Sequence, residues 1–206
     1  MKSLHTLFAA LLLTTAGTAV AASSVDLTVR GIITPSACEP ALSNGGAVDI
    51  GKLSAKDLKV DKPTFLPYQT LQLTVTCDAA TLMALEPKDN RDGSEYANDA
   101  SVFGFGMIND SEKLGGMELT LLNATADGVA SRVISSRNNG TSWTAIPSFE
   151  KGSILSVAAS DVNTPTPVRL MTANVRILPI IAPAAGLTLN NEVAIDGSVT
   201  LTVKYL

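Results

Sequence analysis

The chain has 206 residues, of which 46% are hydrophobic, 17% charged and 4% aromatic, and its formal net charge is −4. The apolar fraction is ordinary for a globular domain, which argues against intrinsic disorder. The acidic balance argues against binding to nucleic acid or to an anionic membrane surface. Histidine occurs once, at His5, and most neutral-pH acid–base catalysts and many metal centres need that side chain. We therefore expect a protein that is not an enzyme and has no cofactor.

The first 22 residues have the pattern of a cleaved export signal. Met1-Lys2 supplies the positive end, Leu7 to Leu13 the apolar stretch, and Ala19 to Ala22 the small residues that signal peptidase reads. The apolar run is too short to span a bilayer. We expect a signal peptide over residues 1–22, no transmembrane span after it, and one exported domain over residues 23–206.

Export makes the two cysteines, Cys38 and Cys77, interpretable as a pair. An oxidising compartment favours disulfides, and two cysteines allow one intramolecular pairing. The alternatives are a metal pair, which would need further ligands beside the cysteines, and a redox pair, whose cysteines are spaced two apart. We expect a structural disulfide that stabilises the fold by roughly 4 kcal/mol in the chain-entropy description.

The rest of the chain alternates apolar and polar residues with a period of two, the pattern of half-buried strands. Clusters of Asn, Asp and Gly separate the runs and predict turns. No segment of helical length has a 3.6-residue period, although residues 54–58 could form one turn. The pattern predicts an all-β fold, a single antiparallel immunoglobulin-like or pilin-like β-sandwich with one disulfide. The alternating apolar positions are Val25, Leu27 and Val29; Leu71, Leu73, Val75 and Cys77; Met117, Leu119 and Leu121; Ile154; Val175 and Ile177; and Val199, Leu201, Val203 and Tyr205.

Few residues are candidates for chemistry. The acidic run from Asp89 to Glu95 could be a calcium loop, but Arg91 stands at one of the alternate positions where such a loop needs an oxygen ligand. The other interpretation is a solvated turn whose Asp and Asn side chains bond their own backbone. No histidine remains to activate a nucleophile, and the one tryptophan, Trp143, is more typical of a core or loop anchor. We expect neither a metal site nor a catalytic residue.

Four short motifs stand out along the chain: Gly31 to Cys38 (GIITPSAC), Gly45-Gly46 followed by Val48 to Gly51, Lys88 to Arg91, and the ending from Asp196 to Leu206. Together they resemble the GltF-like, fimbria-related (DUF1120-type) family of periplasmic proteins. More distantly, the strands that end at the two cysteines and the alternating C-terminal run with its penultimate Tyr205 resemble chaperone–usher pilins.

The resemblance implies a structural or adhesive fimbrial subunit in the periplasm or on the surface of a Gram-negative bacterium. Pilins lack their last strand, and a periplasmic chaperone, then the N-terminal extension of the next subunit, supplies it as an added strand. The partners implied are a chaperone, an usher and other fimbrial subunits. On this interpretation Val199, Leu201, Val203 and Tyr205 contact the added strand, and Val25, Leu27 and Val29 belong to the donor segment.

Two features of the chain depart from the pilin pattern. Only residues 23–37 precede Cys38 in the mature chain, which is short for a donor extension, and Gly197 lies nearer the C-terminus than the corresponding pilin glycine. These departures suit a tip or terminating subunit. They also suit a second possibility, a self-complete periplasmic accessory or ligand-binding sandwich whose last strand is paired on both edges.

Overall fold

The computed structural model describes residue 28 and residues 37–206. The chain divides into two units, residues 1–33 and residues 34–206, and every element below belongs to the second unit. The predicted export signal and the predicted donor residues Val25, Leu27 and Val29 lie outside the described residues.

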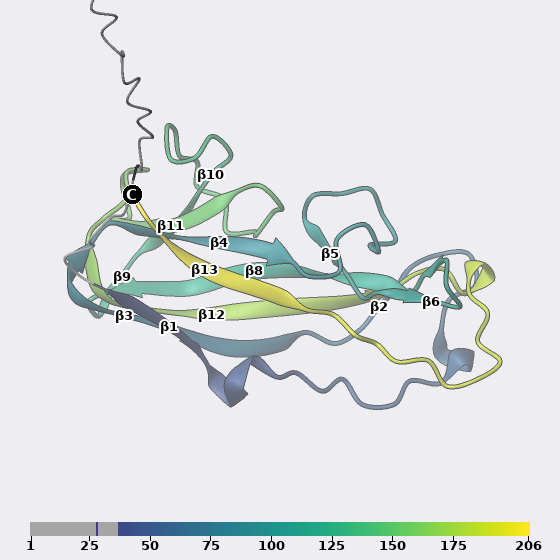
Figure 1. Ribbon diagram of the computed structural model, residues 1–206. Coiled ribbons are helices and arrows are strands. Elements are labelled where there is room, and N and C mark those ends of the chain that lie inside the picture. Colours follow the sequence, from purple (N-terminus) through teal and green to yellow (C-terminus); the bar gives the residue numbers. More distant parts are fainter. Residues whose placement is uncertain (1–27, 29–36) are drawn as a thin grey trace, which may run out of the picture. The chain divides into compact units, whose positions relative to one another are not determined.

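The larger of two main sheets has five strands in the order β1-β3-β12-β8-β5, and all their pairings are antiparallel (Figure 1). Two short strands, β2 and β9, pair with β12 and β8 respectively. The bounds are β1 Cys38–Leu42, β2 Thr64–Phe65, β3 Gln69–Thr81, β5 Val102–Gly104, β8 Gly115–Ala126, β9 Val129–Ala130 and β12 Val168–Ile181.

The smaller main sheet has the order β10-β11-β4-β13, again antiparallel, and it lies over the larger sheet (Figure 1). Its strands are β4 Met83–Asp89, β10 Arg132–Ser136, β11 Ile154–Ala158 and β13 Val199–Tyr205. A separate hairpin joins β6 Met107–Ile108 to β7 Glu112–Lys113, and three short 3₁₀ turns are η1 Ser43–Gly46, η2 Ala55–Asp57 and η3 Ala184–Gly186.

The core lies between the two sheets and takes alternate residues from long strands such as β3 and β12, whereas β5 and β11 are buried along their whole length. Leu71, Leu73 and Val75 of β3 are buried, whereas the residues between them are exposed or half-buried. Met83 and Leu85 of β4 supply the facing layer, each with 1% of its surface exposed. Because burial of apolar area is the main favourable term in folding, this period-two pattern specifies which face of such a long strand turns inward.

The fold class predicted from the sequence is confirmed. The predicted runs Leu71–Cys77, 117–121, 175–177 and 199–205 lie in β3, β8, β12 and β13 respectively, and the one turn allowed at residues 54–58 is η2. Cys38 and Cys77 form the disulfide, with an S–S distance of 1.98 Å. Their strands β1 and β3 place the two residues directly opposite one another.

Gly104, the last residue of β5, shows why glycine is needed where the loop over residues 91–95 packs against this strand. A Cβ at this position would lie 2.1 Å from Ser94 Oγ and 2.8 Å from the Arg91 carbonyl oxygen. The Gly104 N–H donates to the buried Asp89 carboxylate at 2.8 Å. The glycine therefore allows the loop over residues 91–95 to pack against the strand.

Among the described residues, no helix has the length and apolar character required to cross a membrane.

Candidate functional site

The C-terminal strand β13 is an edge strand. From Val199 to Tyr205 it pairs with β4, in register from Asp89 to Met83, and no other strand of the described residues pairs with it. An exposed edge offers a row of unpaired backbone N–H and C=O groups to another extended segment. The edge of β13 is therefore the first candidate for a functional surface.

The register tells which backbone groups of β13 face this free edge. Asn90 N donates to Ser198 O at 2.9 Å, and Leu206 N donates to Leu82 O at 3.1 Å. In an antiparallel pair, every second residue directs its backbone groups toward the partner strand. The even-numbered residues therefore bond β4, and the N–H and C=O groups of Val199, Leu201, Val203 and Tyr205 point to the free edge.

The side chains of β13 that face the core are incompletely covered. Val199, Leu201 and Val203 pack against the main core cluster but are only half-buried. Their neighbours on β4 that face the same core are almost fully buried, with Leu85 at 1% exposure. The difference arises because, within residues 37–206, no strand lies on the other side of β13 to cover it.

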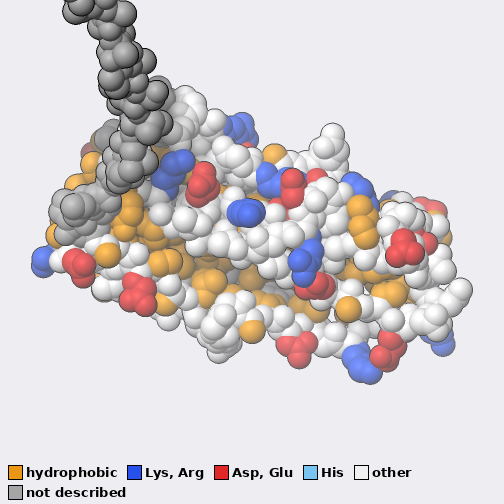
Figure 2. All heavy atoms as spheres, in the orientation of Figure 1, with side chains coloured by type: hydrophobic (Ala, Val, Ile, Leu, Met, Phe, Trp, Pro, Cys, Tyr) orange, Lys and Arg blue, Asp and Glu red, His pale blue; other side chains and the backbone are white. Residues whose placement is uncertain are grey.

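An apolar groove of about 250 Å³ lies beside β13. Figure 2 shows apolar side chains in the hollow between β13 and the segment that follows β1. Apolar side chains from both sheets line this groove, so it is an unfilled part of the sandwich interior. Its lining includes Leu42 and Val48 on one side, Leu71, Leu119, Val175 and Ile177 on its floor, and Ile195, Val199 and Leu201 on the other side.

A second groove of about 540 Å³ continues from the first, and the two share Val48, Ile50 and Ile195. Its walls are two irregular segments, residues 48–58 and residues 189–195, and its floor includes Leu114 and Ile181. The ion pair between Lys52 and Glu192, 3.0 Å long and almost fully exposed, joins the two walls. The candidate acceptor surface, defined as the β13 edge with these two grooves, is therefore longer than the strand itself.

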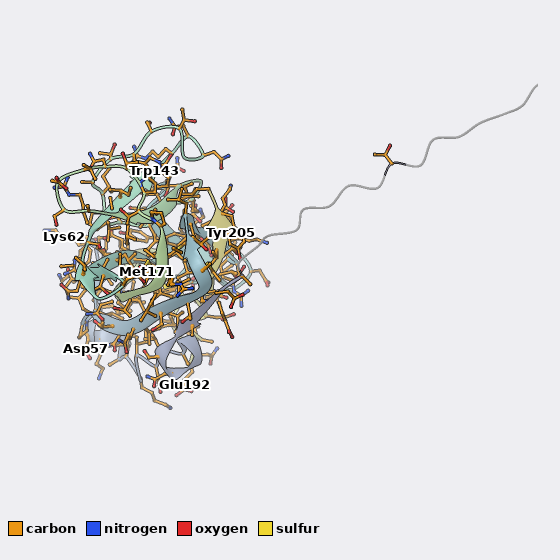
Figure 3. The ribbon with its side chains drawn as sticks, turned by 90° about the vertical axis from the view of Figure 1, so that its left-hand side faces the viewer. Asp57, Lys62, Trp143, Met171, Glu192 and Tyr205 are labelled. Atoms are coloured by element: carbon orange, nitrogen blue, oxygen red, sulfur yellow. A yellow bond between two sulfur atoms is a disulfide. The ribbon has the colours of Figure 1, made fainter. Side chains whose placement is uncertain are left out.

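The other end of the acceptor surface is closed. The hydroxyl of Tyr205 accepts a hydrogen bond of 3.0 Å from the backbone N–H of Cys38. This bond joins the last residue of β13 to the first residue of β1, whose disulfide to Cys77 fixes β1 to the larger sheet. Figure 3 shows Tyr205 at the β13 strand. The two edge strands therefore meet at the Tyr205 end and separate toward Val199.

The four predicted partner-contacting residues occupy different places on this surface. Val199 and Leu201 line the first groove. Val203 packs on the core cluster, and Tyr205 is 41% exposed at the closed end. Sequence reasoning missed the segment over residues 187–195, which supplies a wall of the second groove. A signal was present, because Leu187 and Leu189, and again Val193 and Ile195, are apolar residues two positions apart. All four pack on a second core cluster.

The acidic run that suggested calcium is cross-linked by a lysine. Carboxylate oxygens of Asp89, Asp92 and Glu95 lie within 4.8 Å of one another. Lys151 Nζ lies 3.0 Å from Asp92 Oδ1 and 2.8 Å from Glu95 Oε1. The Asp89 carboxylate accepts from the N–H groups of Arg91 and Gly104, each at 2.8 Å. The cluster thus contains its own cation and satisfies its buried aspartate with backbone donors.

The pKa values of the cluster follow from these contacts. The hydrogen bond and the charge of Lys151 lower the pKa of Asp92. Burial acts to raise the pKa of Glu95, but the hydrogen bond from Lys151, with backbone donors, outweighs burial and lowers it. Burial acts to lower the pKa of Lys151, and its bonds to Glu95 and Asp92 outweigh that and raise it. All three groups are therefore charged at neutral pH, as a structural cross-link requires.

Trp143 is a loop anchor, one of the two roles expected for it. Its indole Nε1 donates to the Gly140 carbonyl at 3.1 Å and the side chain is half-buried. Figure 3 shows it well away from Met171 in the core. It therefore does not contribute to either groove.

Comparison with known proteins places the chain beside two relatives from Escherichia coli (strain K12). Residues 27–120 match the family described as "Protein of unknown function (DUF1120)". The chain is 28% identical to "Protein GltF" over 91% of both chains. It is 23% identical to "Uncharacterized protein YhcF" over 91% of this chain and 93% of that one. These matches support the resemblance to GltF-like proteins that the sequence motifs indicated, and they show that the chain is similar to both relatives along most of its length.

Proposed function

We propose that the protein is an exported, non-enzymatic fimbrial-like subunit, structural or adhesive, whose β13 edge accepts an extended strand from a partner. The partner would be a periplasmic chaperone during export and another subunit after assembly at an usher. The observation that carries the proposal is the β13 edge itself, where the core-facing Val199, Leu201 and Val203 are half-buried beside an apolar groove. Backbone hydrogen bonds would set the register of the added strand and its alternate side chains would fill the groove.

Export to the periplasm is part of the same proposal. The Cys38–Cys77 disulfide supports it, since disulfides persist in oxidising compartments and are rare in the cytosol. The predicted signal over residues 1–22 supports it as well. Mass spectrometry of the protein purified from the periplasm should give a mature chain that begins near residue 23 and lacks two hydrogens because the thiols are oxidised.

A second candidate function is a self-complete accessory or ligand-binding sandwich. The bond from Cys38 N to Tyr205 Oη supports it, because that bond joins the end of β13 to β1 without a partner. Among the described strands, however, β13 pairs with β4 alone, so the pairing on both edges expected for this candidate is not found there. In this case the β13 edge would need no outside strand. The two candidates differ in the state of the backbone groups at the free edge.

Hydrogen exchange distinguishes the two candidates residue by residue. In the isolated mature protein, the amides of Leu201 and Val203 should exchange rapidly, whereas those of Thr200 and Thr202, which bond β4, should be protected. The even-numbered residues thus serve as the internal control on the same strand. Addition of the matching chaperone should protect the odd-numbered amides. Protection of Leu201 and Val203 in the protein alone would favour the self-complete sandwich.

Expression tests the partner directly. Co-expressed with a periplasmic pilus chaperone that recognises it, the protein should be recovered as a one-to-one complex, and without a chaperone it should aggregate or be degraded. A monomer that unfolds reversibly in the absence of any chaperone would contradict the assembly role.

A further inference from the structure

The outward face of the larger sheet has a cluster of side chains that strand acceptance does not use. Arg176 of β12 lies opposite Thr70 of β3, and Asn174 lies opposite Gln72. The neighbouring residues Val175 and Ile177 are buried in the core, so strand alternation turns Arg176 and Asn174 to the outside. We call this cluster the outer-face site, consisting of Phe65, Tyr68, Gln72, Asn174 and Arg176.

Arg176 is a cation without a counter-ion. It forms no salt bridge among the described residues, and its Nε is buried without a hydrogen-bond partner. Its guanidinium lies over the ring of Tyr68, 4.7 Å from the ring centre. A buried donor without a partner costs free energy. Because Nε is shielded from solvent, a ligand would approach the guanidinium through its other N–H groups. Arg176 therefore offers a planar, fork-shaped group to a carboxylate.

The acid nearest to Arg176 in the register does not neutralise it. Glu118 of β8 is opposite Leu178, and Arg176 is opposite Thr120 two residues along. Long side chains can reach such a diagonal neighbour. Arg176 instead lies on Tyr68, toward the β3 side, and leaves Glu118 without it. The cation is thus held in place by an aromatic ring and not by an acid.

Two exposed aromatic side chains lie on the same face as this cation: Tyr68 lies against it, and Phe65 is opposite Ile180, four residues farther along β12. Tyr68 is 57% exposed and Phe65 is 56% exposed. The chain has only nine aromatic residues, so two of them largely exposed on one face is a notable concentration. Because Ile180 and Arg176 are an even number of residues apart on the same strand, the side chains of Phe65 and Arg176 are on the same, outward face of the sheet. Aromatic rings at a surface offer flat apolar area to the CH groups of a ligand.

Two side-chain amides complete the outer-face site. Gln72 and Asn174 are cross-strand neighbours, and neither amide has a side-chain hydrogen bond among the described residues. Each amide presents a donor and an acceptor, the combination that vicinal hydroxyl groups require. The face therefore combines rings, amides and one unpaired cation.

We propose that the outer-face site binds a saccharide that carries a carboxylate. Arg176 pairs with the carboxylate, Gln72 and Asn174 bond ring hydroxyls, and Tyr68 and Phe65 pack on the sugar ring. An acidic peptide would also suit Arg176 and could bond the two amides through its backbone, but a poly-glutamate chain has no ring to pack on Tyr68 and Phe65. The site lies on the opposite face of the sheet from the grooves beside β13, so it does not depend on the proposed strand acceptance.

Titration calorimetry with the full mature protein tests the proposal. The probes are a galacturonic acid trisaccharide, the same trisaccharide with its carboxylates as methyl esters, and a poly-glutamate peptide. The acid form should bind, and the ester should bind at least tenfold more weakly because it lacks the charge. In NMR, the Arg176 Nε–H signal should shift on addition of the acid form. Equal binding of acid and ester, no binding of the acid form, or equally tight binding of the peptide would each overturn the proposal.

Variants distinguish a loss of ligand binding at the outer-face site from a loss of folding. Arg176→Gln should weaken binding of the acid trisaccharide at least tenfold, and Tyr68→Ala should weaken it severalfold. Lys204→Gln, which removes a cation from the other sheet, should leave the affinity unchanged and serves as the matched control. Circular dichroism checks that each variant is folded. If Arg176→Gln does not fold, Arg176→Lys replaces it in the test, because it keeps the charge but loses the planar fork. Wild-type affinity in the variant at position 176 would overturn the assignment.

Discussion

At the scale of single residues, the molecule depends on a few positions where local chemistry allows one solution. Gly104 lies where a methyl group would overlap Ser94 Oγ, and Lys151 neutralises two carboxylates of the loop after β4. Cys38 and Cys77 face each other across neighbouring strands. Each of these positions fastens a loop or an edge strand that has few other contacts, so substitutions there should be costly.

Replacement of Gly104 by alanine should destabilise the fold by about 1–3 kcal/mol, because the added Cβ overpacks a site bounded by backbone. Gly186→Ala is the matched control, since a Cβ there meets no atom within 4 Å. Urea unfolding of both variants measures the difference. Equal midpoints for the two variants would show that the loop over residues 91–95 moves aside freely.

Removal of the Lys151 charge should weaken the dependence of stability on the ionised Glu95. In the wild-type protein the pKa values of Asp92 and Glu95 are lowered, so their contribution to stability is present above the ordinary carboxyl pKa and is lost as the pH falls through the lowered values. In Lys151→Gln, burial is opposed only by the backbone donors, so the pKa of Glu95 should be higher than in the wild-type protein. The variant should lose about 2 kcal/mol near neutral pH.

The stability deficit of Lys151→Gln should shrink once the pH is below about 4, where carboxyl groups are protonated. Thermal unfolding from neutral to acidic pH measures it. The double variant Glu95→Gln with Lys151→Gln is the control and should show a smaller deficit at neutral pH. A deficit that does not change with pH would mean that the lysine acts through packing alone.

The disulfide should contribute about 4 kcal/mol to the free energy of unfolding, because it closes a loop between residues 39 positions apart. The double variant Cys38→Ser with Cys77→Ser should lose that amount in urea titrations. Reduction of the wild-type protein should give the same loss, whereas the reductant should not affect the variant. An unchanged midpoint after reduction would refute this role.

At the scale of elements, β13 combines two roles that most strands keep separate. Its even-numbered residues complete the smaller sheet through β4, and its odd-numbered residues expose backbone groups at an edge. The same odd-numbered residues direct their side chains toward the core. Loss of a backbone N–H at an even position therefore acts on the fold, and loss of one at an odd position acts on the proposed partner, whereas a smaller side chain at an odd position also removes core packing.

Proline substitution tests this separation. Val203→Pro removes an N–H that faces the free edge, so the chaperone complex should weaken at least tenfold while the fold remains. Thr202→Pro removes an N–H that bonds β4 and should cost at least about 1 kcal/mol more in stability. Co-purification with the chaperone and urea unfolding give the two readouts. Undiminished chaperone binding by the folded Val203→Pro variant would contradict strand addition at this edge.

At the scale of the whole molecule, the sandwich has an interior that is filled at one end and open along one side. The Tyr205 end is closed by the bond to Cys38, and the grooves of about 250 and 540 Å³ follow from there toward the irregular segments. A strand that fills the grooves would bind the folded protein and not the unfolded chain. Its binding should therefore raise the stability of the whole domain.

A synthetic peptide of residues 23–36 should raise the melting temperature of the mature protein when it is added in excess. Occupancy at one hundred times the Kd corresponds to about 2.7 kcal/mol of stabilisation. A scrambled peptide of the same composition lacks the alternation of Val25, Leu27 and Val29 and is the control. Equal shifts with both peptides would mean that the grooves take up apolar segments without register.

The sequence predicted the strands because the period of two is written locally, in runs such as Leu71 to Cys77. It also predicted the disulfide, since two cysteines in a chain that is expected to be exported allow one intramolecular pairing. The acidic run illustrates the limit: the residues Asp89 to Glu95 suggested a cation, but the cation is the side chain of Lys151, which is distant in sequence.

By itself, therefore, the sequence determined the class of fold, the inward face of each strand and the relationship to GltF-like proteins, because these depend on local patterns. Only the tertiary structure decided that β13 is an edge, that two irregular segments continue its groove, and that Arg176 stands beside Tyr68 without an acid. Those facts depend on which strands become neighbours, and the choice of neighbours is set by packing between segments far apart in the chain.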